Sequence, residues 1–303
     1  MKLAANRRSF LTCGVAAVSS AALASRPARA PAIEPVQRNG QAKFKLSLAA
    51  YSYRRLLQGK DASLTLADFI GDCAALQLDG TELTSYYFPD SPTPDYLRSL
   101  KRQAFRAGLS ISGTAVRNDF GLAEHSAERQ KWIDHVKTWV EYAEILGAPV
   151  IRIFAGKLQK GMTPEKSHDL MVSGIQECCE HAGKHGIHLA LENHGGPTAT
   201  ATGILKLVQA VDSEWFGVNL DTGNFHSQDP YGELERVAPY ALNVQVKVVL
   251  SGPDKKRVPA DFGRVADILR KAAYRGFVVL EYEESGDPRE ECRKFIEQLR
   301  QAF

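Results

Sequence analysis

Four short segments in the second half of the sequence carry side chains of the types that bind metals and move protons. They read Leu191-Glu192-Asn193-His194, Asn219-Leu220-Asp221-Thr222, Gln245-Val246-Lys247 and Leu280-Glu281-Tyr282-Glu283. In each segment the polar residues stand two apart, the spacing that points side chains to the same face of a strand. Each segment therefore predicts a strand end that aims carboxylates, amides or a cation in one direction.

These side-chain types predict metal-assisted chemistry. Two glutamates, an aspartate and an amide oxygen form a hard-oxygen ligand set, which suits Mn²⁺ or Mg²⁺ better than a metal that prefers thiolates. Burying so many polar groups is costly unless they are paired or bind a cation. The alternative is that the carboxylates form salt bridges with Arg152 and Lys247. Because the acids outnumber the nearby bases, we expect one bound divalent ion, Mn²⁺ or Mg²⁺.

The rest of the chain predicts the elements that would bring these segments together. Short runs typical of strands alternate with longer runs in which apolar residues recur every three or four positions, as in helices. The predicted strands are residues 45–51, 80–84, 110–115, 150–154, 188–192, 217–221, 243–248 and 278–282. Eight such units over residues 43–303 predict a single closed (β/α)8 TIM barrel of the α/β class. The active site of such a barrel lies at the carboxyl ends of its strands, where the four polar segments fall.

An open, doubly wound sheet is the alternative fold. When such a sheet binds a nucleotide it normally has a Gly-rich loop after its first strand, whereas this sequence reads Tyr51-Ser52-Tyr53-Arg54-Arg55 there. Predicted helices give way to strands at Gly80, Gly108, Gly186 and Gly276. We expect these glycines to adopt the left-handed conformation that ends helices.

Taken in this order, the residues resemble the sugar phosphate isomerase/epimerase family, whose members have a xylose-isomerase-like TIM barrel. The resemblance runs from about Phe44 to the C-terminus, and its strongest motifs are Leu191-Glu192-Asn193-His194-Gly195, Val218-Asn219-Leu220-Asp221-Thr222-Gly223-Asn224 and Leu280-Glu281-Tyr282-Glu283. It implies a divalent ion held by Glu192, Asp221, Gln245 and Glu281. We expect substrate contacts from Glu82, Arg152, His194, Asn224 and Lys247.

One segment departs from the family pattern. Many members have a histidine as the third metal ligand, in a His-x-Lys-Asp run, where this sequence reads Gln245-Val246-Lys247-Val248. A glutamine still offers a carbonyl oxygen, so we expect a harder and weaker metal site. Dehydroshikimate dehydratases with this fold are similar to the chain in using an amide at this position.

The expected reaction is isomerisation or epimerisation of a sugar or keto-sugar. A proton leaves a carbon next to a carbonyl and returns to another face or carbon, and the enediolate formed in between is stabilised by the metal. The two ends of this motion need two proton carriers, and we expect Glu192 and Glu281 to be the catalytic residues. A lyase that begins with the same proton abstraction and then expels a leaving group is the alternative. Its reaction would be dehydration, as in a dehydroshikimate dehydratase, or cleavage of a 3-keto-glycoside.

Two other classes of protein share this fold. A nuclease related to AP endonucleases would need a multi-metal cluster with more histidines and a basic face for DNA, and neither is evident in the sequence. A sugar-binding protein without catalysis could lose the metal, but all four ligand-type residues are present. No phosphate cradle stands out. We expect a small sugar-like substrate and no nucleic acid, and the sequence is compatible with a homo-oligomer.

The first thirty residues have the features of an export signal. Asn6-Arg7-Arg8-Ser9-Phe10-Leu11 resembles the twin-arginine motif and is followed by a largely apolar stretch up to Ala24. About 14 apolar residues are too few to span a membrane core of about 30 Å, so we expect no stable membrane anchor. The sequence thus predicts a twin-arginine (Tat) signal at 1–30, a linker at 31–42 and a periplasmic or secreted enzyme.

Removal of this signal changes the charge of the protein. Residues 1–30 carry five positive charges and no acid, so the formal net charge of +3 falls to −2 for residues 31–303. The basic character of the whole chain belongs to the signal, which removes the electrostatic argument for a nucleic-acid partner.

Four cysteines would remain after cleavage: Cys73, Cys178, Cys179 and Cys292. None has CxxC spacing, which argues against zinc-knuckle and thioredoxin-like readings. We expect them to be small buried hydrophobic residues of helices. A disulfide between Cys73 and Cys292 is geometrically feasible, because the first and last helices of a closed barrel are neighbours, but we do not expect it.

The export assignment predicts that replacing Arg7 and Arg8 together with lysine traps the protein inside the cell. The twin-arginine route carries folded cargo, so the trapped protein should be folded. Fractionation of cells that express the variant measures this, and normal export would contradict the assignment.

Overall fold

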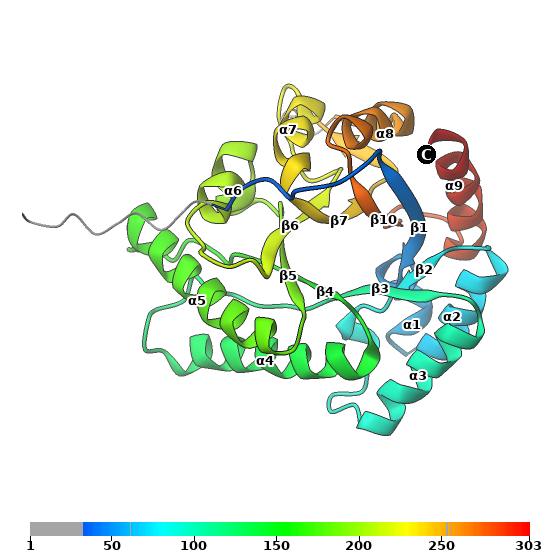
Figure 1. The fold of residues 1–303 in the computed structure, drawn as a ribbon, viewed down its shortest axis with the longest axis horizontal. Helices are drawn as coiled ribbons and strands as arrows, with labels where there is room; N and C mark the ends of the chain where they lie inside the picture. Colours follow the sequence, from blue (N-terminus) through cyan, green and yellow to red (C-terminus); the bar gives the residue numbers. More distant parts are fainter. Residues whose placement is uncertain (1–32, 61, 253, 255) are drawn as a thin grey trace, which may run out of the picture. The chain divides into compact units, whose positions relative to one another are not determined.

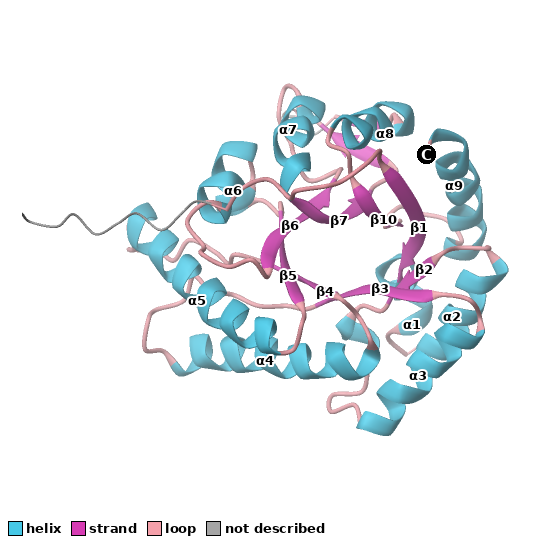
Figure 2. Ribbon diagram, viewed as in Figure 1, coloured by secondary structure: helices cyan, strands magenta, loops and turns pink. Residues whose placement is uncertain are grey.

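A closed barrel of eight parallel strands forms the centre of the molecule (Figures 1 and 2). The computed structural model describes residues 33–303 except 61, 253 and 255, so the predicted signal lies outside the described residues. The strand order around the barrel is β1-β10-β7-β6-β5-β4-β3-β2. The strands are β1 Lys43–Ala49, β2 Gly80–Glu82, β3 Ser110–Ala115, β4 Val150–Ile153, β5 His188–Glu192, β6 Phe216–Asp221, β7 Ala241–Val246 and β10 Arg275–Leu280. The predicted (β/α)8 architecture is confirmed.

Helices surround the barrel on its outside (Figure 2). They are α1 Arg54–Leu57, α2 Leu66–Ala75, α3 Pro94–Arg106, α4 Ala127–Leu146, α5 Pro164–Lys184, α6 Ala201–Val208, α7 Pro230–Val237, α8 Phe262–Lys271 and α9 Pro288–Ala302. Each helix from α2 to α9 begins after a Ser, Thr or Asp whose side chain accepts a hydrogen bond from the first turn. None of the helices in the described residues is long and apolar enough to cross a membrane.

The strand ends differ from the prediction in ways that matter for the site. The predicted strands 243–248 and 278–282 end at Val246 and Leu280, so Lys247 and Glu281 are the first residues beyond β7 and β10. After β7 the chain forms a hairpin of β8 Val249–Ser251 and β9 Arg257–Pro259, which the sequence analysis did not predict. Strands of three residues are too short to show the periodicity by which a strand is recognised.

The hydrophobic core lies between the strands and the helices, whereas the interior of the barrel is polar. Leu189, Leu191, Val218 and Leu220 belong to the same buried cluster as helix residues such as Ile175. Their neighbours along the strands include the buried polar residues Glu192, Asn219 and Asp221 and the small residues Ala190 and Gly217. The strict alternation of a strand thus sends apolar side chains to the helices and polar ones into the barrel, as the two-residue spacing predicts.

The prediction of left-handed glycines is correct at two of the four positions and wrong at the other two. Gly108 and Gly186 have φ of +75° and +67°. The left-handed turns before β2 and within the α8–β10 connection are instead at Gln77 and Ala273. Gly80 and Gly276 lie in strands and lack a side chain for a different reason. A Cβ atom would come within 2.6 Å of Phe277 at Gly80 and within 2.5 Å of the Tyr274 hydroxyl at Gly276.

The described part of the predicted linker, residues 33–42, packs against the amino end of the barrel. The Val36 amide donates to the Pro239 carbonyl at 3.0 Å, just before β7. The Arg38 guanidinium donates to the same carbonyl at 3.2 Å and lies 5.4 Å from the centre of the Tyr274 ring. These contacts lie at the end of β7 opposite to Lys247, so this segment does not contribute to the site described below.

The four cysteines in the described residues are free and buried. Burial raises the pKa of Cys73 and of Cys292 to about 12, so both thiols stay protonated at neutral pH. We predict that Ellman's reagent hardly labels the native protein and titrates four thiols after unfolding of the chain without residues 1–30. A count of two would show that a disulfide forms.

Candidate active site

A pocket of about 160 Å³ opens at the carboxyl ends of the strands. Five of the predicted site residues line it: Arg152, Glu192, His194, Lys247 and Glu281. Its other lining residues are Tyr51, Tyr86, Arg117, Phe154 and Glu283. Of these, only Glu283 was singled out in the sequence, because the segments after the first four strands lack the regular two-residue polar spacing.

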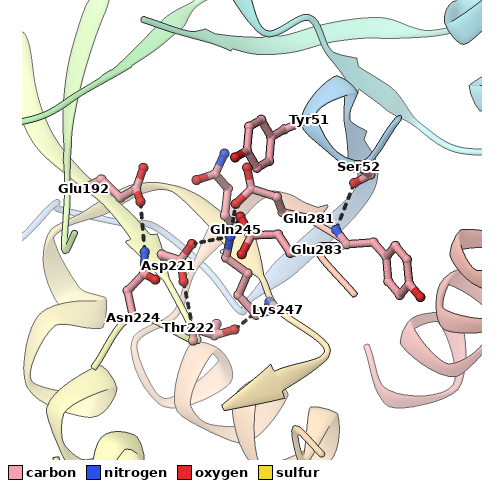
Figure 3. Close-up of polar contacts among 12 residues, drawn as sticks. Tyr51, Ser52, Glu192, Asp221, Thr222, Asn224, Gln245, Lys247, Glu281 and Glu283 are labelled. Atoms are coloured by element: carbon pink, nitrogen blue, oxygen red, sulfur yellow. Dashed lines mark hydrogen bonds and ion pairs between the residues drawn. The ribbon is translucent and has the colours of Figure 1, made fainter. Parts of the chain in front are cut away.

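The Lys247 side chain lies among three carboxylates on one side of the pocket (Figure 3). Its Nζ is 2.9 Å from Oε1 of Glu283 and 3.4 Å from Oδ2 of Asp221, and it donates a hydrogen bond to Oε2 of Glu281. Lys247 is 8% exposed and Asp221 is fully buried. These residues come from the ends of β6, β7 and β10, which are neighbours in the barrel.

Glu192 lies on another side of the pocket and has different partners. Its Oε2 is 2.8 Å from Nε of Arg152, and its Oε1 is 2.7 Å from Nδ1 of His194. The Asn224 amide donates to Oε1 at 2.9 Å (Figure 3). The structure therefore brings together four predicted site residues, Arg152, Glu192, His194 and Asn224, around a single carboxylate.

The ionisation of Glu192 and His194 reflects this pairing. Burial opposes the charge on Glu192, but Arg152 and the hydrogen bond with His194 outweigh it, and the pKa of Glu192 is lowered. The same hydrogen bond raises the pKa of His194 above its usual value, although partial burial opposes this. Glu192 is thus held ionised, which is the state of a base.

The pKa values of the carboxylates near Lys247 are raised, in contrast to that of Glu192. Burial raises the pKa of Asp221, Lys247 opposes this, and the charges of Glu192 and Glu281 raise it further. The pKa of Glu281 is raised for the same reasons, with burial first and Lys247 opposing. One ammonium group does not compensate for all the acids crowded around it, so a proton or a further cation is favoured here.

A closed ring of hydrogen bonds inside the barrel joins four buried side chains, those of Glu82, Asn219, Asn243 and Gln245. The Gln245 amide nitrogen donates to Glu82 Oε1 at 2.8 Å, and its amide oxygen accepts from Asn219 at 2.7 Å. The Asn243 amide donates to Asn219 at 2.9 Å and to Glu82 at 3.2 Å. Burial raises the pKa of Glu82 to about 7, and Glu281 contributes.

This ring gives two predicted site residues roles that the sequence did not predict. Glu82 is 1% exposed and does not line the 160 Å³ pocket, so its contact with substrate remains a prediction. Gln245 holds the ring together through both ends of its amide. Because a carbonyl oxygen has two lone pairs, the hydrogen bond from Asn219 is compatible with the predicted role of Gln245 as a metal ligand.

Side chains just beyond the strands tie neighbouring strand ends together. Asn193 exchanges two hydrogen bonds of 2.8 Å with the backbone of Asp221, and Asn118 does the same with Phe154 at 2.6 and 2.8 Å. The Thr222 hydroxyl accepts from the Lys247 amide at 2.9 Å. The Ser52 hydroxyl accepts from the Tyr282 amide at 2.9 Å. The backbone that carries the site residues is therefore fixed by specific contacts.

The structure shows the salt bridges with Arg152 and Lys247 that are the alternative to a metal site, and the acids fit a divalent ion only in part. Oδ2 of Asp221 is buried and accepts no hydrogen bond, and it is ion-paired with the Lys247 ammonium group at 3.4 Å, so it could bind a metal ion only in place of that ion pair. Glu82, Glu192, Asp221, Glu281 and Glu283 also outnumber the cations Arg117, Arg152 and Lys247. An ion shared by Asp221 and Glu281 would take the place of the Lys247 ammonium group. Oxygen donors of this kind suit Mn²⁺ or Mg²⁺.

The predicted acidic ligands Glu192, Asp221 and Glu281 do not all bring an oxygen within 4.8 Å of one another in this structure, and the group of side chains that does so lies elsewhere. Within the described part of the chain, one group of three His, Cys, Asp or Glu side chains brings its ligand atoms within 4.8 Å of one another, and it consists of Glu141, His181 and His185. These residues are near the carboxyl ends of α4 and α5, which lead into the amino ends of β4 and β5. The group is therefore at the opposite end of the barrel from the pocket.

The sequence of the chain matches one protein family. The family described as "Xylose isomerase-like TIM barrel" matches residues 70–302, which includes the whole candidate active site except Tyr51 and Ser52. A comparison with curated proteins gave no match.

Solved structures with the same fold include epimerases and a dehydratase. D-psicose 3-epimerase from Clostridium cellulolyticum H10 is 15% identical with a TM-score of 0.70, over 85% of this chain and 99% of that one. The 3-keto-D-glucoside 4-epimerase of E. coli is 14% identical with a TM-score of 0.69, over 86% and 100%. A probable 3-DHS dehydratase from Bacillus anthracis is 20% identical with a TM-score of 0.66, over 84% and 98%. At these identities the likeness shows the fold.

The charges around Lys247 predict how the protein responds to its loss. Lys247→Met keeps much of the side-chain volume but leaves Asp221, Glu281 and Glu283 without their shared cation. At neutral pH we expect a loss of about 3–5 kcal/mol in the free energy of unfolding. The loss should grow as the pH rises above about 4, because the buried acids then ionise more readily in the unfolded chain than in the folded one.

Thermal unfolding with and without MnCl2 measures this effect. Mn²⁺ should restore much of the stability of Lys247→Met by replacing the missing positive charge. Lys271→Met is the control, because Lys271 pairs with Glu235 at the surface, where its side chain is 74% exposed. If Lys247→Met unfolds like this control, the ammonium group does not neutralise the acids.

Proposed function

The chain belongs to the xylose isomerase-like TIM barrel family, and from this premise we propose that it is a sugar-modifying enzyme. The proposed reaction is isomerisation or epimerisation of a sugar or keto-sugar by proton transfer, assisted by one divalent metal ion. The proposal rests on the geometry of the pocket and on the fold that it shares with the epimerases named above.

The observation that carries the proposal is the placement of two carboxylates in one small pocket. Glu192 and Glu281 both line the 160 Å³ pocket. Glu192 is the last residue of β5 and Glu281 follows β10, and these strands are three apart around the eight-stranded barrel, so the two side chains approach a bound molecule from different sides. Two proton carriers on different sides of one carbon skeleton are what epimerisation and aldose–ketose isomerisation need.

The surroundings of the two glutamates suit different tasks. Glu192 is kept in place and ionised by Arg152 and His194, so it can accept the proton from a carbon next to the substrate carbonyl. Glu281 receives a hydrogen bond from Lys247 and can return a proton to the other face or to the neighbouring carbon. Arg152, His194 and Lys247 also line the pocket and can donate hydrogen bonds to substrate oxygens as charge develops on them.

Glu192, Asp221, Gln245 and Glu281 are the residues proposed to hold the divalent ion. When bound, such an ion would polarise the substrate carbonyl and stabilise the negative charge of the enediolate. The buried Asp221 oxygen that accepts no hydrogen bond supports this assignment. We propose Mn²⁺ or Mg²⁺ because all four side chains offer oxygen ligands.

A lyase is the second candidate, and Tyr51 favours it. Tyr51 lines the pocket, and burial together with Glu283 and Glu281 raises the pKa of its hydroxyl, although Arg54 and Lys247 oppose this. The hydroxyl therefore stays protonated at neutral pH and could give its proton to a departing oxygen. After the same initial proton abstraction, such a step would lead to dehydration or to cleavage of a keto-glycoside.

Glu281→Gln tests the proton-transfer role. The variant keeps the shape and one ligand oxygen of the side chain but removes the acid–base group. Turnover should fall by about 10²-fold or more while substrate binding persists. Glu180→Gln is the matched control, because Glu180 is exposed on α5, and it should leave turnover unchanged.

The reaction is followed in D2O with Mn²⁺ or Mg²⁺ and a panel of keto-sugars, aldoses and 3-keto-glycosides. Deuterium in an otherwise intact sugar supports the isomerase or epimerase. Deuterium exchange that occurs only together with release of a leaving group and an unsaturated product would show a lyase instead. Tight binding without any exchange would identify a sugar-binding protein.

A further inference from the structure

A second and larger cavity adjoins the catalytic pocket. It has a volume of about 490 Å³ and lies against the connections that follow β3, β4 and β5. Arg117, Phe154 and His194 line both the catalytic pocket and this outer chamber. The two spaces are therefore parts of one cleft, with these three side chains at the junction.

The sizes of the two spaces suggest how they are used. Small-molecule sites typically have volumes of roughly 300–1,000 Å³, and the catalytic pocket alone, at about 160 Å³, is below this range. The outer chamber, at about 490 Å³, is within it. A ligand that fills the cleft would thus place its reacting end between Glu192 and Glu281 and most of its volume in the outer chamber.

Aromatic rings form two walls of the outer chamber. Trp132 is half-buried near the start of α4, and Phe154 follows β4. The Phe154 ring contacts the Arg152 guanidinium, 4.1 Å from its centre, and the His194 ring, whose centre is 4.5 Å away. Flat, rigid rings of this kind offer contact area to the C–H face of a sugar at a small cost in side-chain entropy.

Apart from His194 at the junction with the catalytic pocket, the charged groups of the outer chamber are balanced. Arg117 and Lys157 supply two positive charges, and Asp119 and Glu128 supply two negative ones. An equal mixture of donors and acceptors suits the hydroxyl groups of a neutral ring, which both donate and accept hydrogen bonds. A phosphate or carboxylate would instead favour a surplus of cations.

The floor of the outer chamber is fixed by backbone contacts. Oδ1 of Asp119 accepts from the amides of Gly121 and Lys157 at 2.9 and 3.1 Å. Gly156 passes so close to Asp119 that a Cβ atom would meet Oδ1 at 2.2 Å, and its φ of +112° also favours glycine. The loops after β3 and β4 are therefore held together in one arrangement, which makes the outer chamber a formed site.

We propose that the outer chamber is a subsite for a second, neutral sugar ring, so that the substrate is a glycoside of at least two rings. The reacting ring occupies the catalytic pocket, and the second ring lies against Trp132 and Phe154. The inference deepens the proposed function, on which it rests for the assignment of the reacting end.

Isothermal titration calorimetry of the protein without residues 1–30 tests the subsite. The probes are cellobiose, maltose, lactose and sucrose, compared with glucose, fructose, galactose and glucose 6-phosphate. We expect at least one disaccharide to bind about tenfold more tightly than either of its component sugars. Trp132→Ala should remove this preference by weakening the disaccharide about tenfold, with little change for the monosaccharides.

Two further variants separate contact from folding. Trp132→Phe keeps an aromatic face and should restore most of the preference. Phe105→Ala on α3 is the control, because Phe105 is 81% exposed and lies outside both cavities, and it should bind like the wild type. If Trp132→Ala fails to fold, two measurements decide the question. They are the preference of the wild type for a disaccharide over its component sugars, and the extent to which Trp132→Phe keeps that preference.

The outcomes also separate the subsite from the proposed reaction. Equal binding of disaccharides and their component sugars overturns the subsite, even if monosaccharides exchange protons. Tightest binding of glucose 6-phosphate overturns it as well, because the outer chamber would then be an anion site. A preference for a disaccharide that depends on Trp132, without proton exchange in D2O, supports the subsite and contradicts the proposed reaction.

Discussion

The arrangement of residues at the carboxyl ends of the barrel strands depends on how their buried negative charges are neutralised. A closed parallel barrel directs the carboxyl ends of all its strands to the same place, and here β5 and β6 end with an acid and β10 is followed by one. Arg152 and Lys247 divide these acids between them, Arg152 beside Glu192 and Lys247 beside Asp221 and Glu281. The acids are not fully neutralised by these cations. Burial raises the pKa of Asp221 and of Glu281 by more than the single ammonium group of Lys247 lowers it. This imbalance makes the site receptive to a proton or to a divalent ion.

The contacts beneath and beside these charges keep the site rigid. The ring of Glu82, Asn219, Asn243 and Gln245 fills the barrel interior below the pocket, and each of its three amide side chains forms at least one hydrogen bond. Asn193 and similar residues fasten each strand end to its neighbour. Buried polar networks of this kind are costly when they are incomplete and specific when every group has a partner. A catalytic pair of carboxylates needs such support, because small displacements of the reacting groups lower the rate steeply.

The fold that this chain shares with other enzymes is compatible with several reactions, and the residues of the pocket limit which of them are feasible. Epimerases and a dehydratase have this barrel at 14–20% identity, so architecture alone does not select a reaction. The choice depends on which groups face the substrate carbonyl and which can protonate a departing oxygen. In this chain Glu192, Glu281 and Tyr51 line one pocket, and we propose the two glutamates for the first requirement and Tyr51 for the second. Gln245 is engaged in the buried ring of hydrogen bonds.

The sequence by itself determined the barrel, the order of its strands along the chain and the faces of the strands that carry polar residues. It could do so because two-residue alternation and helical spacing are local properties, readable over a few neighbouring residues. Only the tertiary structure decided three other features of the site. They are the grouping of Arg152, Glu192, His194 and Asn224, the position of Lys247 among the acids, and the hydrogen bonds of Gln245. Gln245 and Glu82 are 163 residues apart along the chain. Their contact depends on the closure and register of the whole barrel, which no local pattern encodes. The outer chamber likewise exists only because three loops, after β3, β4 and β5, meet at one face.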